Sequence, residues 1–133
     1  MQKEKKYPIL NLDPTHLDEN YYERRGNTWD CPTLVEFCKR EGYIPFDMPI
    51  AGIPLDELPW NVSSFKDIVN HAHRIDKVDL KHPIILDDEG SVADGYHRIA
   101  KAILEGRSTI LAIRMQKMPT ISGKTDDIAT ISQ

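Results

Sequence analysis

The spacing of apolar and polar positions predicts two strands and one helix in the second half of the chain. The alternation in residues 108–115 fits a half-buried strand, and Pro-Ile-Ile-Leu at 83–86 is a short apolar run typical of a central strand. After Ser64, apolar side chains recur every three or four residues, which predicts a helix. We expect its apolar face to pack on the core: Phe65, Ile68, Val69, Ala72 and Ile75. Asp67 adds an approximate capping box at its start.

Residues that favour helix ends predict two further helices. Asp30 is a suitable N-cap, Pro32 follows in the first turn, and an apolar stripe runs to Gly42. We expect this stripe to dock against the core or a partner. A second helix begins at Tyr96 and ends at Gly106, a suitable residue for a left-handed C-terminal cap. The chain is therefore expected to fold as an α/β protein, a small mixed sheet with packed helices and an N-terminal helical extension.

The remaining segments are predicted to be extended. Prolines limit residues 44–58 to an edge strand or an extended segment. Residues 7–12 are expected to form a short strand or an extended arm packed on the domain. The tail from residue 119 is rich in Thr, Ser and Asp and is expected to be mobile or to fold only against something. We divide the single domain into an extension (1–47), a core (48–116) and a polar tail (117–133).

Composition narrows the class of protein. The 133 residues are 40% hydrophobic and 29% charged, and the formal net charge of -4 argues against coating nucleic acid by bulk electrostatics. No apolar run approaches the ~20 residues that span a bilayer, and the charged N-terminus lacks a signal-peptide pattern, so we expect a cytoplasmic protein without membrane contact. Cys31 and Cys38 on one helix would lie about 10 Å apart along its axis, too far for a disulfide, which predicts two buried free thiols.

The segment Asp94-Gly95-Tyr96-His97-Arg98 joins a predicted strand to a predicted helix. Glycine at a helix start allows close approach of a bound group, and the free N–H groups of the first turn favour an anion. His97 and Arg98 add side-chain donors, and a guanidinium matches phosphate geometry. The alternative is structural: Asp94 caps the helix while His97 and Arg98 lie on a solvated face.

With this motif in place, residues from about Met48 to Met115 resemble the ParB/sulfiredoxin superfamily. The matching order is a strand-like segment at 50–58, the helix from Ser64, the strand at 83–86, the motif with its helix, and the closing strand at 108–115. In that family the turn binds the phosphates of a nucleotide. The resemblance therefore implies phosphate contacts by Gly95, Tyr96, His97 and Arg98, with ATP, ADP or CTP and Mg²⁺ as ligands.

Two activities of the family fit this sequence poorly. In sulfiredoxins the residue before the motif histidine is the attacking cysteine, whereas here it is Tyr96, whose phenol cannot act as a thiolate. ParB proteins carry a helix-turn-helix region after this domain, and only 18 residues follow Met115. We therefore expect no direct DNA binding; a segregation-related role would need a partner to supply the DNA contacts. Overall acidity also counts against a nuclease.

The resemblance to free-standing kinases of the superfamily suggests a phosphotransferase, with Asp94 and His97 as catalytic residues. Those kinases take a general base from a glutamate just after the first strand, where this chain has Leu-Pro-Trp-Asn at 58–61. Asp56 or Glu57 would serve only with a shifted register. The alternative is a non-catalytic interaction module that keeps the turn for structure or nucleotide sensing, with the N-terminal helix as a partner surface.

The remaining candidates are possible metal ligands and one aromatic residue. His71 and His73 point about 200° apart on a helix and cannot share an ion, so no structural metal is expected. A Mg²⁺ bound with a nucleotide would find Asp94 and Asp87 nearest in the sequence. Trp60 either stacks on a nucleotide base or plugs the core beside its near neighbour Phe65.

Overall fold

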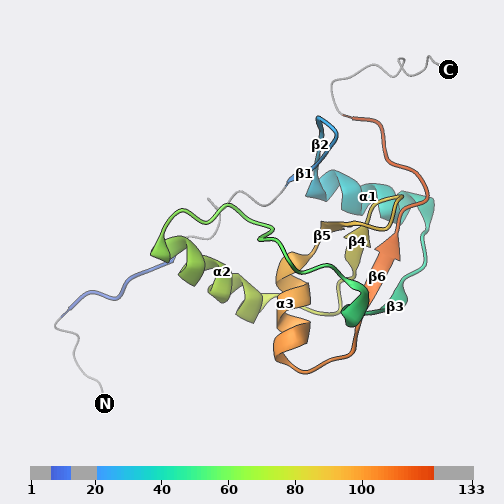
Figure 1. The fold of residues 1–133 in the computed structure, drawn as a ribbon. Coiled ribbons are helices and arrows are strands. Elements are labelled where there is room, and N and C mark those ends of the chain that lie inside the picture. The colour runs from blue at the N-terminus through green and yellow to red at the C-terminus, as the bar shows by residue number, and fades with distance from the viewer. Residues whose placement is uncertain (1–6, 13–20, 122–133) are drawn as a thin grey trace.

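The computed structural model describes residues 7–12 and 21–121, which form a small mixed α/β protein (Figure 1). Its elements are, in chain order, β1 (Tyr21–Arg24), β2 (Asn27–Asp30), α1 (Cys31–Glu41), β3 (Phe46–Pro49), the 3-10 turn η2 (Ile50–Gly52), α2 (Phe65–Lys77), β4 (Ile84–Leu86), β5 (Val92–Asp94), α3 (Tyr96–Leu104) and β6 (Thr109–Arg114). The predicted α/β class and the three predicted helices are confirmed. In the described part of the chain, no helix is both long enough and apolar enough to cross a membrane.

Four strands form a mixed sheet in the order β3-β6-β4-β5. β6 runs parallel to β4 and antiparallel to β3, and β4 pairs antiparallel with β5. The proline-rich segment supplies an edge strand, as predicted, but β3 covers Phe46–Pro49, and the strand expected at 50–58 is wrong. There the chain turns through η2 and continues without regular structure, and Pro54 in this segment cannot donate a ladder hydrogen bond.

The sheet is packed on both faces because successive side chains of a strand point to opposite sides. Ile84 and Leu86 of β4 join one buried cluster with Ile99 and Ala102 of α3. Ile85, between them, joins a second cluster with α1. The alternation within three residues of β4 therefore places α3 and α1 on opposite faces of the sheet.

Helix α1 begins and ends at the predicted residues. The Asp30 carboxylate accepts a hydrogen bond from the Thr33 N–H at 2.7 Å, and Gly42 is left-handed (φ 71°) and donates to the carbonyls of Cys38 and Lys39. The helix buries its apolar stripe on the domain itself, with the side chains of Leu34, Phe37 and Cys38 beside Trp29 and Met115. Both cysteines are buried and free, as predicted.

The β1–β2 hairpin was not predicted. Its register pairs Tyr21 with Asp30, and Arg25 and Gly26 both take positive φ at the turn (53° and 82°). Two left-handed residues match the twist of a two-residue hairpin. The Arg-Gly pair was the available sequence signal, although it is weaker than Asn-Gly because arginine rarely adopts positive φ.

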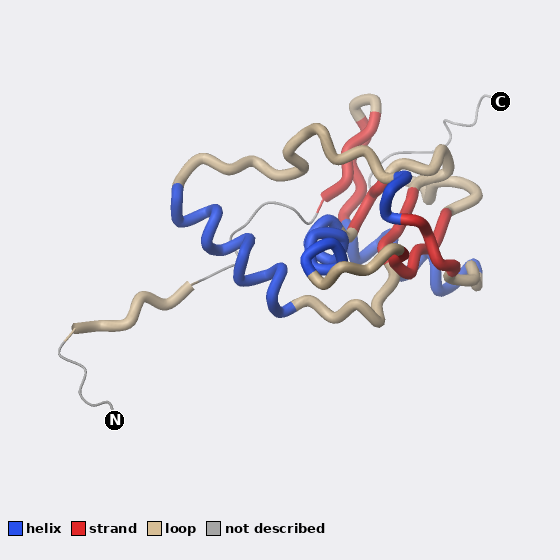
Figure 2. The backbone as a smooth tube through the Cα atoms, turned by 60° about the horizontal axis from the view of Figure 1, so that its bottom comes forward, coloured by secondary structure: helices blue, strands red, loops and turns tan. Residues whose placement is uncertain are grey.

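The predicted core face of helix α2 is largely exposed: Phe65, Ile68 and Ala72 are exposed, while Val69 and Ile75 are half-buried. Phe65 is 79% exposed and Ile68 is 53% exposed, whereas the buried residues are Asn70 and His71 on the other side of the helix. The helix lies at the outer edge of the molecule in both views (Figures 1 and 2) and contacts α3. Its apolar spacing identified the helix, but a polar face joins it to the domain.

The chain segments outside these elements depart in part from expectation. Residues 7–12 form no strand and are mostly exposed. The indole N–H of Trp29 donates to the Pro119 carbonyl at 2.9 Å, and Met118 and Ile121 pack against the cluster under α1. The first residues of the predicted polar tail are therefore held on the core, while the rest of the predicted mobile segment lies outside the described residues.

Candidate functional site

The N-terminus of α3 is built around a glycine that no other residue can replace without strain. Gly95 is the N-cap, with φ 117° and ψ 21°. A Cβ there would lie 2.6 Å from Cγ2 of Ile84 and 2.9 Å from its Cβ, so the helix start is pressed against β4. No side chain caps the helix, so the hypothesis that Asp94 does so is wrong.

Asp94 instead pairs with Arg98 one helical turn away. The Arg98 Nη2 donates to Oδ2 of Asp94 at 3.2 Å and to the carbonyl of Pro83 at 3.3 Å. Arg98 is 17% exposed at its side chain, and its Nε is buried without a hydrogen-bond partner. A buried guanidinium N–H without a partner costs about 1–3 kcal/mol, so this group is suited to donate a hydrogen bond to an anionic ligand.

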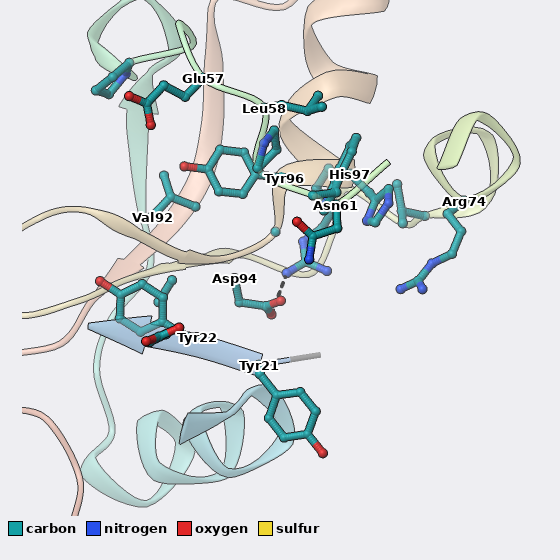
Figure 3. Close-up of a pocket in the computed structure, with 18 of the residues that line it drawn as sticks. Tyr21, Tyr22, Glu57, Leu58, Asn61, Arg74, Val92, Asp94, Tyr96 and His97 are labelled. Carbon is teal, nitrogen blue, oxygen red and sulfur yellow. Dashed lines mark hydrogen bonds and ion pairs between the residues drawn. The ribbon is translucent and has the colours of Figure 1, made fainter. Parts of the chain in front are cut away.

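A cleft of about 740 Å³ opens beside this helix start. One wall is the β1–β2 hairpin, the second is the segment 54–61, and Arg74 of α2 contributes to a third. All five motif residues, 94–98, line it together with Trp60. Figure 3 shows three of them, Asp94, Tyr96 and His97, around the cleft. The structure thus brings together every site residue predicted from the sequence.

Three aromatic rings stack beside the cleft: Trp60 and His97 line it, and His71 packs against both. Nδ1 of His71 and Nε2 of His97 lie 2.9 Å apart in a buried hydrogen bond. The indole of Trp60 stacks at 4.2 Å on His71 and at 4.3 Å on His97, and the two imidazoles are 5.1 Å apart. Two rings on opposite faces of an indole would be separated by the sum of those distances, so both lie on one face of Trp60. The core-plug interpretation of Trp60 beside Phe65 is wrong, because Phe65 is exposed.

His97 is uncharged at neutral pH. Burial lowers its pKa to about 3, and the charges of Arg74 and Arg98 and the neighbouring His71 act in the same direction. As a neutral ring it can donate or accept a single hydrogen bond besides the one to His71. A neutral His97 thus offers the cleft a hydrogen bond but no charge.

Carboxylates line the opposite part of the cleft. Asp56 and Glu57 lie on the wall formed by the segment 54–61, and Glu23 of β1 lies on the hairpin wall. From the sequence, Asp56 or Glu57 could serve as a general base only with a shifted register. Their place on the wall comes from the irregular path of the chain after η2, which no strand pattern reveals.

Asp87 has a structural role and does not fit a metal. Its carboxylate accepts hydrogen bonds from the Tyr22 hydroxyl (2.5 Å), Arg24 (3.1 Å) and the backbone N–H groups of Glu89 and Ser91 (both 2.9 Å). Burial alone would raise its pKa, but these bonds together hold the pKa below its usual value. Asp87 therefore ties the β1–β2 hairpin to the β4–β5 turn and is not available to Mg²⁺. Within the described residues, no three His, Cys, Asp or Glu side chains are arranged to hold a metal ion.

Cys31 lies closer to the motif than its sequence position suggests. The pKa of its thiol is raised to about 12, mainly by burial, and the charge of the Asp94 carboxylate and a hydrogen bond to it act in the same direction. Burial likewise raises the pKa of Cys38 to about 11. Neither thiol forms a thiolate near neutral pH, so neither is a nucleophile there.

Sequence analysis missed the contributions of α2 and the hairpin to the site. His71 and Arg74 are three residues apart on the polar face of α2, and this spacing was the only available signal. The class that the fold and site define is a small mixed α/β domain with a cleft at a glycine-initiated helix. Comparison with protein-family models, curated proteins and solved structures finds no significant match.

Proposed function

We propose that the cleft binds the phosphate of a nucleotide or of another phosphorylated small molecule. The observation that carries this proposal is the start of α3: Gly95 brings uncapped backbone N–H groups to the cleft next to the Arg98 guanidinium, whose Nε lacks a partner. A helix N-terminus carries partial positive charge, and a guanidinium forms charge-assisted hydrogen bonds with phosphate. The resemblance of residues 48–115 to ParB/sulfiredoxin domains points to the same ligand class.

The distribution of charge and the size of the cleft favour a ligand with two different ends. Arg74, Arg98 and the helix start attract an anion, whereas Asp56 and Glu57 suit hydroxyl or amino groups. A volume of about 740 Å³ lies within the range of small-molecule sites, ~300–1,000 Å³. ATP, ADP and CTP with Mg²⁺ are the candidates. The phosphates of the nucleotide and water would supply most of the Mg²⁺ ligands, because residues 7–12 and 21–121 offer no carboxylate cage.

Phosphoryl transfer is the second candidate function, and Glu57 on the cleft wall favours it. A carboxylate within reach of an acceptor hydroxyl can take up its proton, while the helix start, His97 and Arg98 would stabilise charge on the transferring group. A non-catalytic nucleotide sensor with the same site would bind without turnover. Glu57→Gln tests the choice: for an enzyme, it lowers the rate of nucleotide consumption by ~10²-fold with binding unchanged.

Binding itself is tested by thermal unfolding with ATP, ADP, CTP, GTP and inorganic phosphate, with and without Mg²⁺. A ligand at 100 times its Kd stabilises the folded state by ~2.7 kcal/mol. We expect this shift in the wild type and its loss in Arg98→Ala, with circular dichroism showing that the variant stays folded.

Arg107→Ala is the matched control, because Arg107 is exposed, pairs with Glu105 and lies outside the cleft. Arg98→Lys separates charge from geometry, since a lysine keeps the charge but loses the planar fork. No stabilisation of the wild type by any of the five ligands, or equal stabilisation of Arg98→Ala, would overturn the proposal.

A further inference from the structure

The buried histidine pair joins two helices at the end of the cleft. His71 belongs to α2 and His97 to α3, and the two side chains belong to residues only 4% and 6% exposed. Their rings are within 15° of coplanarity, and the hydrogen bond between Nδ1 of His71 and Nε2 of His97 lies under the Trp60 indole. The stack fixes both rings in plane and excludes water from this side of the bond.

This arrangement determines which nitrogen of His97 is left for a ligand. Nε2 is engaged by His71, so Nδ1 is the ring atom that remains. One hydrogen lies between the two rings. If His71 donates it, the proton of a neutral His97 is on Nδ1, which then donates to a ligand; if His97 donates it, Nδ1 is an acceptor. An anionic ligand is compatible only with the first arrangement.

Burial, and after it the charges around the pair, keep His97 in the neutral state. Arg74 lies on the same helix as His71, and Arg98 follows His97 on α3; both lie at the cleft wall with His97. Two cations beside the pair oppose the addition of a proton, and Trp60 adds an apolar cover. The pair therefore holds a single shared hydrogen, and its position is decided by what the rings contact.

We propose that His71 is a positioning residue: by donating from Nδ1 to Nε2 of His97, it places the His97 proton on Nδ1 and makes His97 a hydrogen-bond donor to phosphate. The geometry of the pair stands by itself, and its use on phosphate rests on the proposed function. His71 would act without touching the ligand. In metal sites, the hydrogen-bond partner of a ligating histidine fixes the histidine tautomer in the same way.

The test compares three variants of full-length protein. His71→Phe keeps a ring under Trp60 and removes the donor, whereas His71→Asn places an amide N–H where Nδ1 was and restores it. His73→Phe is the matched control, because His73 is on the same helix, only partly buried, and outside the pair. The probes are inorganic phosphate and the nucleotide that best stabilises the wild type.

The first readout needs no ligand. Imidazole ¹⁵N spectra of the free protein should show a proton on Nδ1 of His97 in the wild type, in His73→Phe and in His71→Asn, and a different tautomer distribution in His71→Phe. An unchanged His97 tautomer in His71→Phe would overturn the positioning role even if phosphate binds. The opposite tautomer in the wild type would overturn it as well.

The second readout is affinity. A hydrogen bond to a charged group is worth about 1.5–3 kcal/mol, which is about 10- to 100-fold in Kd. We expect His71→Phe to weaken nucleotide binding by at least about tenfold, His71→Asn to recover most of it and His73→Phe to have no effect. Equal affinity in His71→Phe and the wild type would overturn the inference, whereas absence of binding in the wild type with the tautomer result intact would overturn the proposed function alone.

Discussion

Replacing Gly95 by alanine would impose two separate penalties, which two other glycines of the chain allow us to separate. Gly95 combines a left-handed backbone (φ 117°) with a position where Cβ meets Ile84. Gly106 is also left-handed (φ 75°), but a Cβ there meets nothing within 4 Å. Gly52 has neither constraint. Alanine therefore meets no penalty at Gly52, backbone strain alone at Gly106, and backbone strain with steric overlap at Gly95.

The magnitudes follow from the geometry. Left-handed backbone costs a non-glycine residue about 1–2 kcal/mol. The approach of 2.6 Å to Cγ2 of Ile84 adds an overpacking cost of about 1–3 kcal/mol, because Ile84 is fully buried in the sheet and cannot move away. Alanine also restricts the unfolded chain, which offsets about 0.4–1 kcal/mol at each site. We expect Gly95→Ala to lose about 2–4 kcal/mol, Gly106→Ala to lose about 0–1.5 kcal/mol and Gly52→Ala to gain about 0.4–1 kcal/mol.

Urea unfolding followed by circular dichroism gives the three free energies, provided that the m values agree. The discriminating quantity is the difference between Gly95→Ala and Gly106→Ala, which reports mainly the overlap with Ile84, since the third neighbour, Nη2 of Arg98, lies farther away at 3.1 Å. A difference below about 0.5 kcal/mol would refute the close approach of α3 to β4. A large loss in Gly52→Ala would show that the substitution reports something other than local strain.

Three further predictions concern single contacts. The pKa of His97 is lowered to about 3, so the unfolded state takes up the proton first as pH falls. Stability from this group is complete above about pH 6.5 and should fall by up to about 1.4 kcal/mol per pH unit between pH 6.5 and about 3. The slope in urea melts should flatten in His97→Gln. Asp87→Asn should lower the free energy of unfolding by about 3 kcal/mol, because it leaves Arg24 without its buried partner. Asp88→Asn should cost under about 1 kcal/mol, because Asp88 is partly exposed. Equal losses would contradict the role of Asp87 in tying the β1–β2 hairpin to the β4–β5 turn. Trp29→Phe should lose about 1 kcal/mol with its bond to Pro119 and free the 118–121 segment to faster hydrogen exchange.

Local chemistry determined the parts of the site that lie within one turn of chain. Gly95, His97 and Arg98 were predicted as neighbours because a strand, a glycine and a helix succeed one another within a few residues. The caps at Asp30 and Gly42 were predictable for the same reason, since capping bonds join residues three or four apart. Interactions of this range are visible as spacing in the sequence.

Only the tertiary structure decided which side of α2 meets the domain. Periodicity predicted its apolar face inward, yet Asn70 and His71 are buried and Phe65 is exposed. The bond between His71 and His97 joins residues 26 apart, and that between Tyr22 and Asp87 joins residues 65 apart. A helical pattern identifies a face but carries no information about which neighbour will cover it. The motif was therefore predictable from the sequence, whereas the groups that position it became apparent only when distant segments were brought together.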